Sequence, residues 1–142
     1  EVVNAESQRL GVVRYHQEVV HTQKGKKIHD EAGYWMWDPA TDLVMLSFVI
    51  PRGLTVLAGG RCQDMLAGEQ GKILEVSSGG SSAEWRIVQS PFLQDKAKTE
   101  SFTRKLIVSG DNLSYTQTSA LDIYSDKFNH TDENALSRLK RK

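Results

Sequence analysis

The pattern that most constrains this chain is a series of short apolar runs, rich in β-branched and aromatic residues, that turn-forming residues separate. Helical periodicity is almost absent. Links that contain Gly, Asp, Asn or Pro favour tight reversals, so consecutive strands are expected to be antiparallel neighbours. About eight strands are predicted, over residues 10–20, 27–37, 43–50, 54–59, 72–77, 83–89, 99–108 and 113–124.

The 142 residues suit one domain, 1–142, with one core. An antiparallel sheet of this size must bury one face, and it can do so as a sandwich or by closing into a barrel. The periodicity alone does not distinguish a sandwich from a barrel. Both faces of the run 27–37 mix polar and apolar residues, which favours an all-β, antiparallel up-and-down barrel with an internal cavity.

Composition excludes several classes of protein. Lys plus Arg and Asp plus Glu each number 18, so no net positive field favours nucleic acid as a partner. No apolar run approaches the ~20 residues that a membrane span needs. Cys62 is the single cysteine, which excludes an internal disulfide and fits a cytoplasmic protein. We expect Cys62 to be a lone thiol without a structural role, beside a turn or bulge at Gly59-Gly60.

Few residues carry recognisable chemistry. The four histidines lack metal-ligand spacing, and no nucleophile motif is present, so no catalytic residue is assigned. His29 and Glu31 share one face of their strand, where they either form a solvated or hydrogen-bonded pair or point together into a cavity. Trp35 is expected to face inward with them. The charges at Asp132-Glu133 and at residues 140–142 are expected to form a solvated tail.

The segment His-Asp-Glu-Ala-Gly-Tyr-Trp at residues 29–35 resembles the His-x-Glu-x-Gly-Tyr-Trp segment of nitrobindin-like, fatty-acid-binding-protein-like haem-binding β-barrels. The resemblance covers most of the chain. It extends over residues 37–41, 50–53, 111–115 and 130–138.

The resemblance implies a calycin-like, ten-stranded barrel that holds ferric haem b through one axial histidine near the C-terminus. His130 is the candidate iron ligand, although the register could place Asn134 there instead. His29 matches the second cavity histidine of that family, and Glu31 and Trp35 are expected beside the cofactor. The family's opening Gly-x-Trp-x-Gly strand is lacking, so either the chain begins late or the barrel closes differently, for example by pairing of two edges in a homodimer.

We therefore expect a small hydrophobic ligand in the barrel cavity, with haem as the most specific candidate. A fatty acid or another lipid-like ligand, carried without haem, is the alternative. If haem binds, the resemblance implies nitric-oxide or peroxynitrite chemistry at the iron. A third hypothesis is a protein-interaction module that uses an exposed sheet edge.

Overall fold

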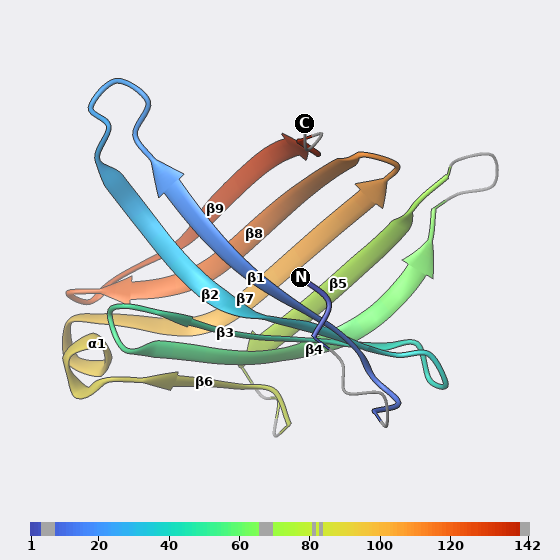
Figure 1. Cartoon of the computed structure of the whole chain (residues 1–142). Coiled ribbons are helices and arrows are strands. Elements are labelled where there is room, and N and C mark those ends of the chain that lie inside the picture. The colour runs from blue at the N-terminus through green and yellow to red at the C-terminus, as the bar shows by residue number, and fades with distance from the viewer. Residues whose placement is uncertain (4–7, 66–69, 81, 83, 140–142) are drawn as a thin grey trace.

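The chain forms one strongly curled antiparallel sheet with a single short helix (Figure 1). The structure, a computed structural model, describes residues 1–3, 8–65, 70–80, 82 and 84–139. The elements are β1 (Gly11–Val20), β2 (Lys27–Asp38), β3 (Leu43–Ile50), β4 (Leu54–Asp64), β5 (Lys72–Gly79), β6 (Arg86–Gln89), α1 (Pro91–Lys96), β7 (Ala97–Ser109), β8 (Asn112–Ile123) and β9 (Asp126–Ser137).

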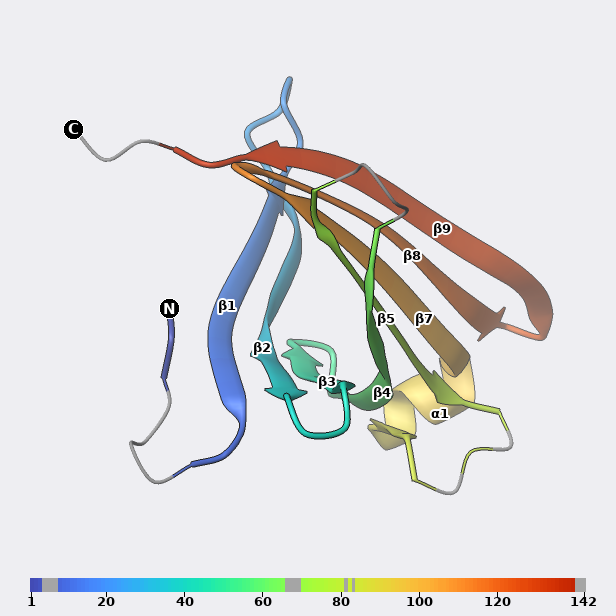
Figure 2. The same ribbon diagram turned by 90° about the vertical axis from the view of Figure 1, so that its right-hand side faces the viewer.

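The strands follow the order β1-β2-β3-β4-β5-β7-β8-β9, and β6 pairs with the first half of β4. Figure 2 shows that this sheet curls into a half-barrel, with β1 and β9 as the strands at its two ends. The predicted antiparallel, barrel-type all-β fold is confirmed. Among the described residues no ladder joins β1 to β9, so the barrel is open on that side.

Two elements were missing from the sequence-based prediction. Asp132-Glu133 was expected in a solvated tail but lies within β9, because β8 and β9 pair along their whole length after a turn at Tyr124 and Ser125. Residues 140–142, the rest of the expected tail, lie outside the described residues, as does the predicted strand start at residue 83. Every residue of β9 is exposed, so its sequence carries no apolar alternation that could have revealed it.

The helix α1 was also unforeseen, since its six residues are too few to show a helical period. Ser90 caps it by accepting a hydrogen bond from the backbone N–H of Leu93 at 3.4 Å, and Pro91 occupies its first turn. The buried side chain of Leu93 packs the helix against the core. No described helix is long and apolar enough to cross a membrane.

Gly59 and Gly60 lie inside β4 and not in a turn, which corrects the prediction. A Cβ on Gly60 would lie 1.7 Å from the Glu75 carbonyl oxygen, and one on Gly59 would lie 2.1 Å from the Trp85 ring. These glycines therefore permit close packing between strands and under the indole. Cys62 follows on the same strand, half-buried against the core.

The packed core occupies only one end of the half-barrel. Its buried side chains come from the inner faces of β3, β4, β5 and β7 and from α1, which lies at the same end (Figure 2). They are Val44, Leu46, Phe48, Leu54, Val56, Ala58, Val76, Leu93 and Phe102. The other end, between β1–β2 and β8–β9, is lined by larger and more polar side chains and contains the pockets described below.

A substitution of Gly33, in the segment 29–35, tests the close packing of β2 on β3. A Cβ there would lie 2.2 Å from the Ser47 carbonyl oxygen and 2.8 Å from the Phe48 Cβ, so Gly33→Ala is expected to lower the free energy of unfolding by roughly 1–3 kcal/mol. Gly11→Ala is the matched control, because its added methyl would meet Trp37 at an ordinary 3.8 Å. Urea denaturation of both variants measures the difference, and equal stabilities would contradict the packing.

Candidate functional site: a cleft in the open half-barrel

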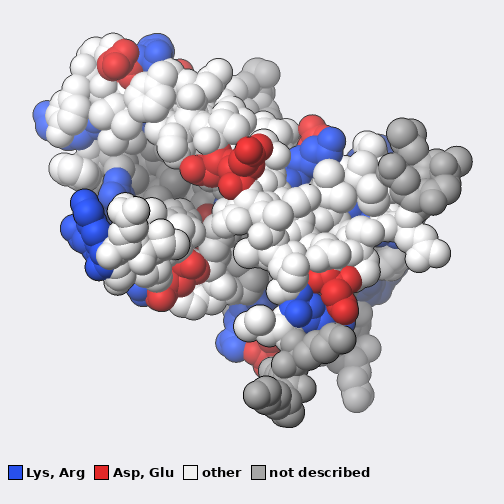
Figure 3. All heavy atoms as spheres, turned by 90° about the horizontal axis from the view of Figure 1, so that it is seen from above, with Lys and Arg blue, Asp and Glu red and all other residues white. Residues whose placement is uncertain are grey.

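The open side of the half-barrel contains one continuous depression, here called the inner cleft. It consists of two adjoining pockets with volumes of about 400 and 370 Å³. Five residues line both pockets, which shows that the pockets are continuous. These are Gln17, Val19, Arg104, Tyr115 and Asn134. Seen from above, this face of the molecule is visibly hollowed (Figure 3).

The first pocket is the more apolar part of the inner cleft. Strand alternation turns Trp35 of β2 inward, as predicted, where it packs against the core and lines this pocket. Apolar side chains from β1, β7, β8 and β9 complete the wall, namely Val13, Leu106, Leu113 and Leu136. Such a wall favours a ligand with an apolar surface.

The second pocket brings together the two histidines singled out in the sequence. His29 of β2 and His130 of β9 both line it, although neither strand pairs with the other. The Nε2 atom of His130 lies 3.0 Å from the Asp132 carboxylate, and its side chain is 55% exposed. Asn134, the alternative position from the sequence comparison, lines both pockets. Two imidazoles therefore lie at this end of the inner cleft, each with its Nε2 atom close to a carboxylate.

Glu31 lies beneath the cleft and is only 1% exposed. Its two carboxylate oxygens accept hydrogen bonds from Arg104, from Nη1 to Oε1 at 2.7 Å and from Nη2 to Oε2 at 2.9 Å. The Tyr15 hydroxyl donates to Oε1, and His29 Nε2 lies 3.4 Å from Oε2. The sequence left open whether His29 and Glu31 form a solvated or hydrogen-bonded pair or point together into a cavity. The Glu31 carboxylate is not solvated, because it points inward and both its oxygens accept hydrogen bonds.

These contacts determine the charge state of Glu31. Burial alone raises its pKa, but hydrogen bonds from His29 and Arg104, the charge of Arg104 and the hydrogen bond from Tyr15 outweigh burial and lower the pKa to about 2. Burial and the nearby Glu31 charge raise the pKa of Tyr15, so its hydroxyl keeps its proton. The cluster therefore remains a carboxylate, a guanidinium and a neutral phenol at neutral pH.

Arg104 is equally well surrounded. Its Nε donates to Gln117 Oε1 at 2.8 Å, and its guanidinium carbon lies 5.1 Å from the centre of the Phe48 ring and 5.3 Å from that of Phe102. Nearby, Gln17 of β1 donates a 2.9 Å hydrogen bond to the Tyr115 hydroxyl of β8. Because Glu31, Tyr15 and Gln117 already take up its donors, we regard Arg104 as a structural wall residue and not as an anion receptor.

The sequence analysis missed Arg104, Gln17, Tyr115 and Gln117. One signal was present for Arg104, since it occupies an inward position of β7 between the apolar residues Phe102 and Leu106. A charged residue at such a position needs a buried partner. Only the fold shows that the partner is Glu31.

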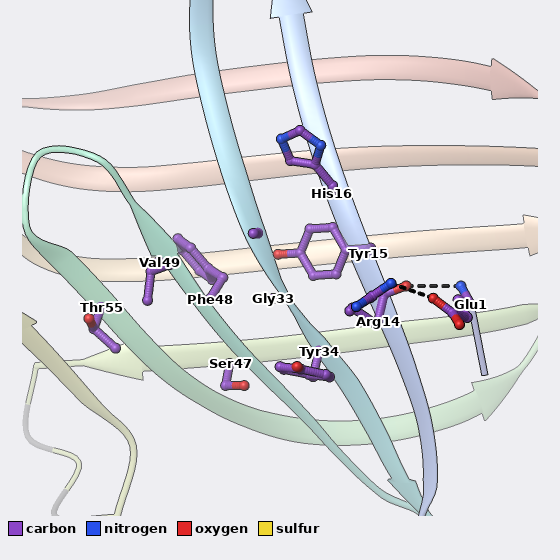
Figure 4. Close-up of a pocket in the computed structure, with 11 residues that line it drawn as sticks. Glu1, Arg14, Tyr15, His16, Gly33, Tyr34, Ser47, Phe48, Val49 and Thr55 are labelled. Carbon is purple, nitrogen blue, oxygen red and sulfur yellow. Dashed lines mark hydrogen bonds and ion pairs between the residues drawn. The ribbon is translucent and has the colours of Figure 1, made fainter. Parts of the chain in front are cut away.

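A second hollow lies on the outer face of β1–β4 and has a volume of about 640 Å³ (Figure 4). Its basic residue Arg14 is ion-paired with Glu1 on its rim. Farther along the same face, His16, Glu18 and Asp30 cluster, and the Lys27 ammonium bonds both carboxylates. Because these charged groups of the outer face already pair with one another, we take the inner cleft as the candidate site.

Removing one partner of the buried ion pair tests its structural role. Arg104→Met leaves the Glu31 carboxylate buried without its cation, and we expect a loss of roughly 3–5 kcal/mol in the free energy of unfolding. Arg14→Met, which removes the exposed partner of Glu1, is the control and is expected to cost little. Urea denaturation with circular dichroism measures both, and a stable Arg104→Met protein would contradict the role.

The lowered pKa of Glu31 also predicts a pH dependence. Because the pKa falls from 4.5 to about 2 on folding, this carboxylate contributes its full stability above pH 4.5 and loses it as the pH falls toward 2. The free energy of unfolding should fall in that window. The double variant Glu31→Gln/Arg104→Met retains the other carboxylates and should fall less steeply, so equal slopes for the two proteins would exclude Glu31 as the source.

Comparisons with known proteins agree with this architecture. The chain is similar in structure to the crystal structure of Rv2717c from M. tuberculosis, with a TM-score of 0.73 and 21% sequence identity over 96% of this chain and 76% of that one, which shows the shared fold. No curated protein matches the sequence. The family model for the THAP4-like, heme-binding beta-barrel domain matches residues 1–138. The resemblance predicted from the sequence is confirmed, and the chain belongs to this family of heme-binding β-barrel domains.

Proposed function

We propose that the inner cleft binds haem b and that the imidazole of His130 is the axial ligand. The observation that carries the proposal is the position of His130 on the inner face of β9, in the pocket that adjoins the apolar wall around Trp35. A haem site requires an imidazole and an apolar surface for the macrocycle, and the residues present supply both. Membership of a heme-binding family supports the choice of ligand.

The residues around the proposed ligand have separate tasks. Asp132 lies 3.0 Å from His130 Nε2 and can hold the ring in one orientation. Trp35 and Leu136 cover apolar surface. His29 keeps its Nε2 near Glu31 and serves as a wall residue in place of a ligand. Bound haem would supply an iron centre for small molecules such as nitric oxide, the chemistry that the sequence resemblance implies.

A lipid-like ligand is the second candidate, because the lining of the apolar pocket of about 400 Å³ includes neither His29 nor His130. A fatty acid needs this apolar wall but no axial imidazole. The two functions therefore differ in their dependence on His130.

Haemin titration followed by absorbance spectroscopy tests the haem proposal. The unmodified chain should give a spectrum typical of histidine-ligated ferric haem. His130→Ala removes a coordinate bond and should abolish that band or shift it strongly, whereas His29→Ala removes a wall residue and should keep the spectrum with altered affinity.

His21→Ala is the control for loss of a histidine, because His21 lies in the turn after β1, lines neither pocket of the inner cleft and should leave binding unchanged. Circular dichroism establishes that each variant is folded. An unchanged spectrum for His130→Ala would refute the ligand assignment. If the unmodified chain binds no haemin but binds a fluorescent fatty acid, the lipid-like alternative replaces haem.

A further inference from the structure

One hydrogen bond between side chains crosses the interior of the half-barrel at the inner cleft. The Nε2 atom of Gln17 on β1 donates to the Tyr115 hydroxyl of β8 at 2.9 Å, and both side chains are half-buried. These two strands are not neighbours in the sheet, and they lie on opposite walls of the half-barrel (Figure 2). We call this contact the cross-barrel bridge, because it joins side chains of the two walls directly.

The cross-barrel bridge lies at the boundary between the two pockets of the inner cleft. Along β8, Leu113 lines only the first pocket, Tyr115 lines both and Gln117 lines only the second. The same order is found on β9, in the residues Leu136, Asn134 and Asp132. On β1, Gln17 lines both pockets. The shared residues therefore form one level across the cleft, and the bridge spans it.

A ligand that occupies both pockets must pass this level. The proposed haem would contact His130 in the second pocket and Trp35 and Leu136 in the first, so its macrocycle must cross the level of the bridge. A porphyrin is rigid and planar, and it cannot bend around a contact between side chains. A short apolar ligand can occupy the first pocket, of about 400 Å³, without reaching the second.

We propose that Gln17 and Tyr115 are specificity-determining residues of the inner cleft, and that their hydrogen bond must open before a rigid planar ligand can span both pockets. This inference rests on the proposed function, because a ligand confined to the first pocket has no need to open the bridge. The bridge therefore weakens the binding of planar ligands and leaves that of short apolar ligands unchanged.

Removal of either partner tests the bridge on the full chain. Tyr115→Phe removes only the hydroxyl, and Gln17→Met keeps the length of the side chain without its amide. A hydrogen bond between neutral side chains corresponds to a roughly two- to tenfold change in a binding constant. Each variant should therefore bind haemin and metal-free protoporphyrin IX more tightly by that factor, while its affinity for octanol stays the same.

Tyr34→Phe is the matched control, because it removes the same hydroxyl from the outer face of β2 (Figure 4). It should leave all three affinities unchanged. Fluorescence titration measures the binding of the two porphyrins. The NMR signal of the Trp35 indole N–H, in the first pocket, measures the binding of octanol. Circular dichroism establishes that each variant is folded.

The double variant Gln17→Met/Tyr115→Phe distinguishes the bridge from a general loosening of the cleft. Because either substitution alone breaks the hydrogen bond, the double variant should bind porphyrins no more tightly than the better single variant. Effects that multiply, or an equal gain in affinity for octanol, would overturn the proposal. Unchanged or weaker porphyrin binding in either single variant would overturn it as well.

Metal-free protoporphyrin separates this inference from the proposed function. It has the shape of haem but no iron, so its binding does not require an imidazole ligand. If His130→Ala leaves the haemin spectrum unchanged, the axial ligand assignment fails, whereas the porphyrin affinities of the bridge variants still decide the role of the bridge. If neither the unmodified chain nor any bridge variant binds a porphyrin, the bridge is not what excludes planar ligands, and the proposal is wrong.

Discussion

The buried ion pair between Arg104 and Glu31 is the interaction on which the interior arrangement depends. It links β7 to β2, two strands that lie well apart in the sheet order, and Tyr15 adds β1 to the same cluster. Burying two charges costs several kcal/mol for each ion unless their hydrogen bonds are complete. Completing them requires Tyr15 and Gln117 beside the pair, so the interior must be polar at this level of the half-barrel.

This polar level separates two regions with different tasks. On one side, the apolar residues around Leu46 and Phe102 form a core packed without water-exposed groups. On the other side, the inner cleft keeps an apolar wall at Trp35 and two imidazoles, His29 and His130. Since the charges of Arg104 and Glu31 are already paired, the two imidazoles remain as nitrogen ligands on this side. That division suits a ligand with a large apolar surface and a group that an imidazole can bind, which is why we propose haem b.

Local patterns in the sequence were sufficient for most of the sheet. Alternating apolar residues and turn residues located eight strands, and alternation in the segment 27–37 put His29, Glu31 and Trp35 on one face. β9 was not predicted, because all its residues are exposed. A turn was wrongly predicted at Gly59-Gly60, because those glycines are required for close packing within the sheet. The Arg104–Glu31 pair was beyond reach, since 73 residues separate its partners and only the curl of the sheet brings them together.

The open side of the half-barrel exposes two kinds of group, the inward side chains of the cleft and the backbone groups at the edge of β1. A ligand in the inner cleft would contact inward side chains such as Trp35 and His130. The backbone N–H and C=O groups of His16 and Glu18 lie instead in the plane of the sheet. Exposed backbone groups can bond to water, so the open edge costs little while it is wet. A ligand held by the inward side chains therefore need not bond to the edge of β1.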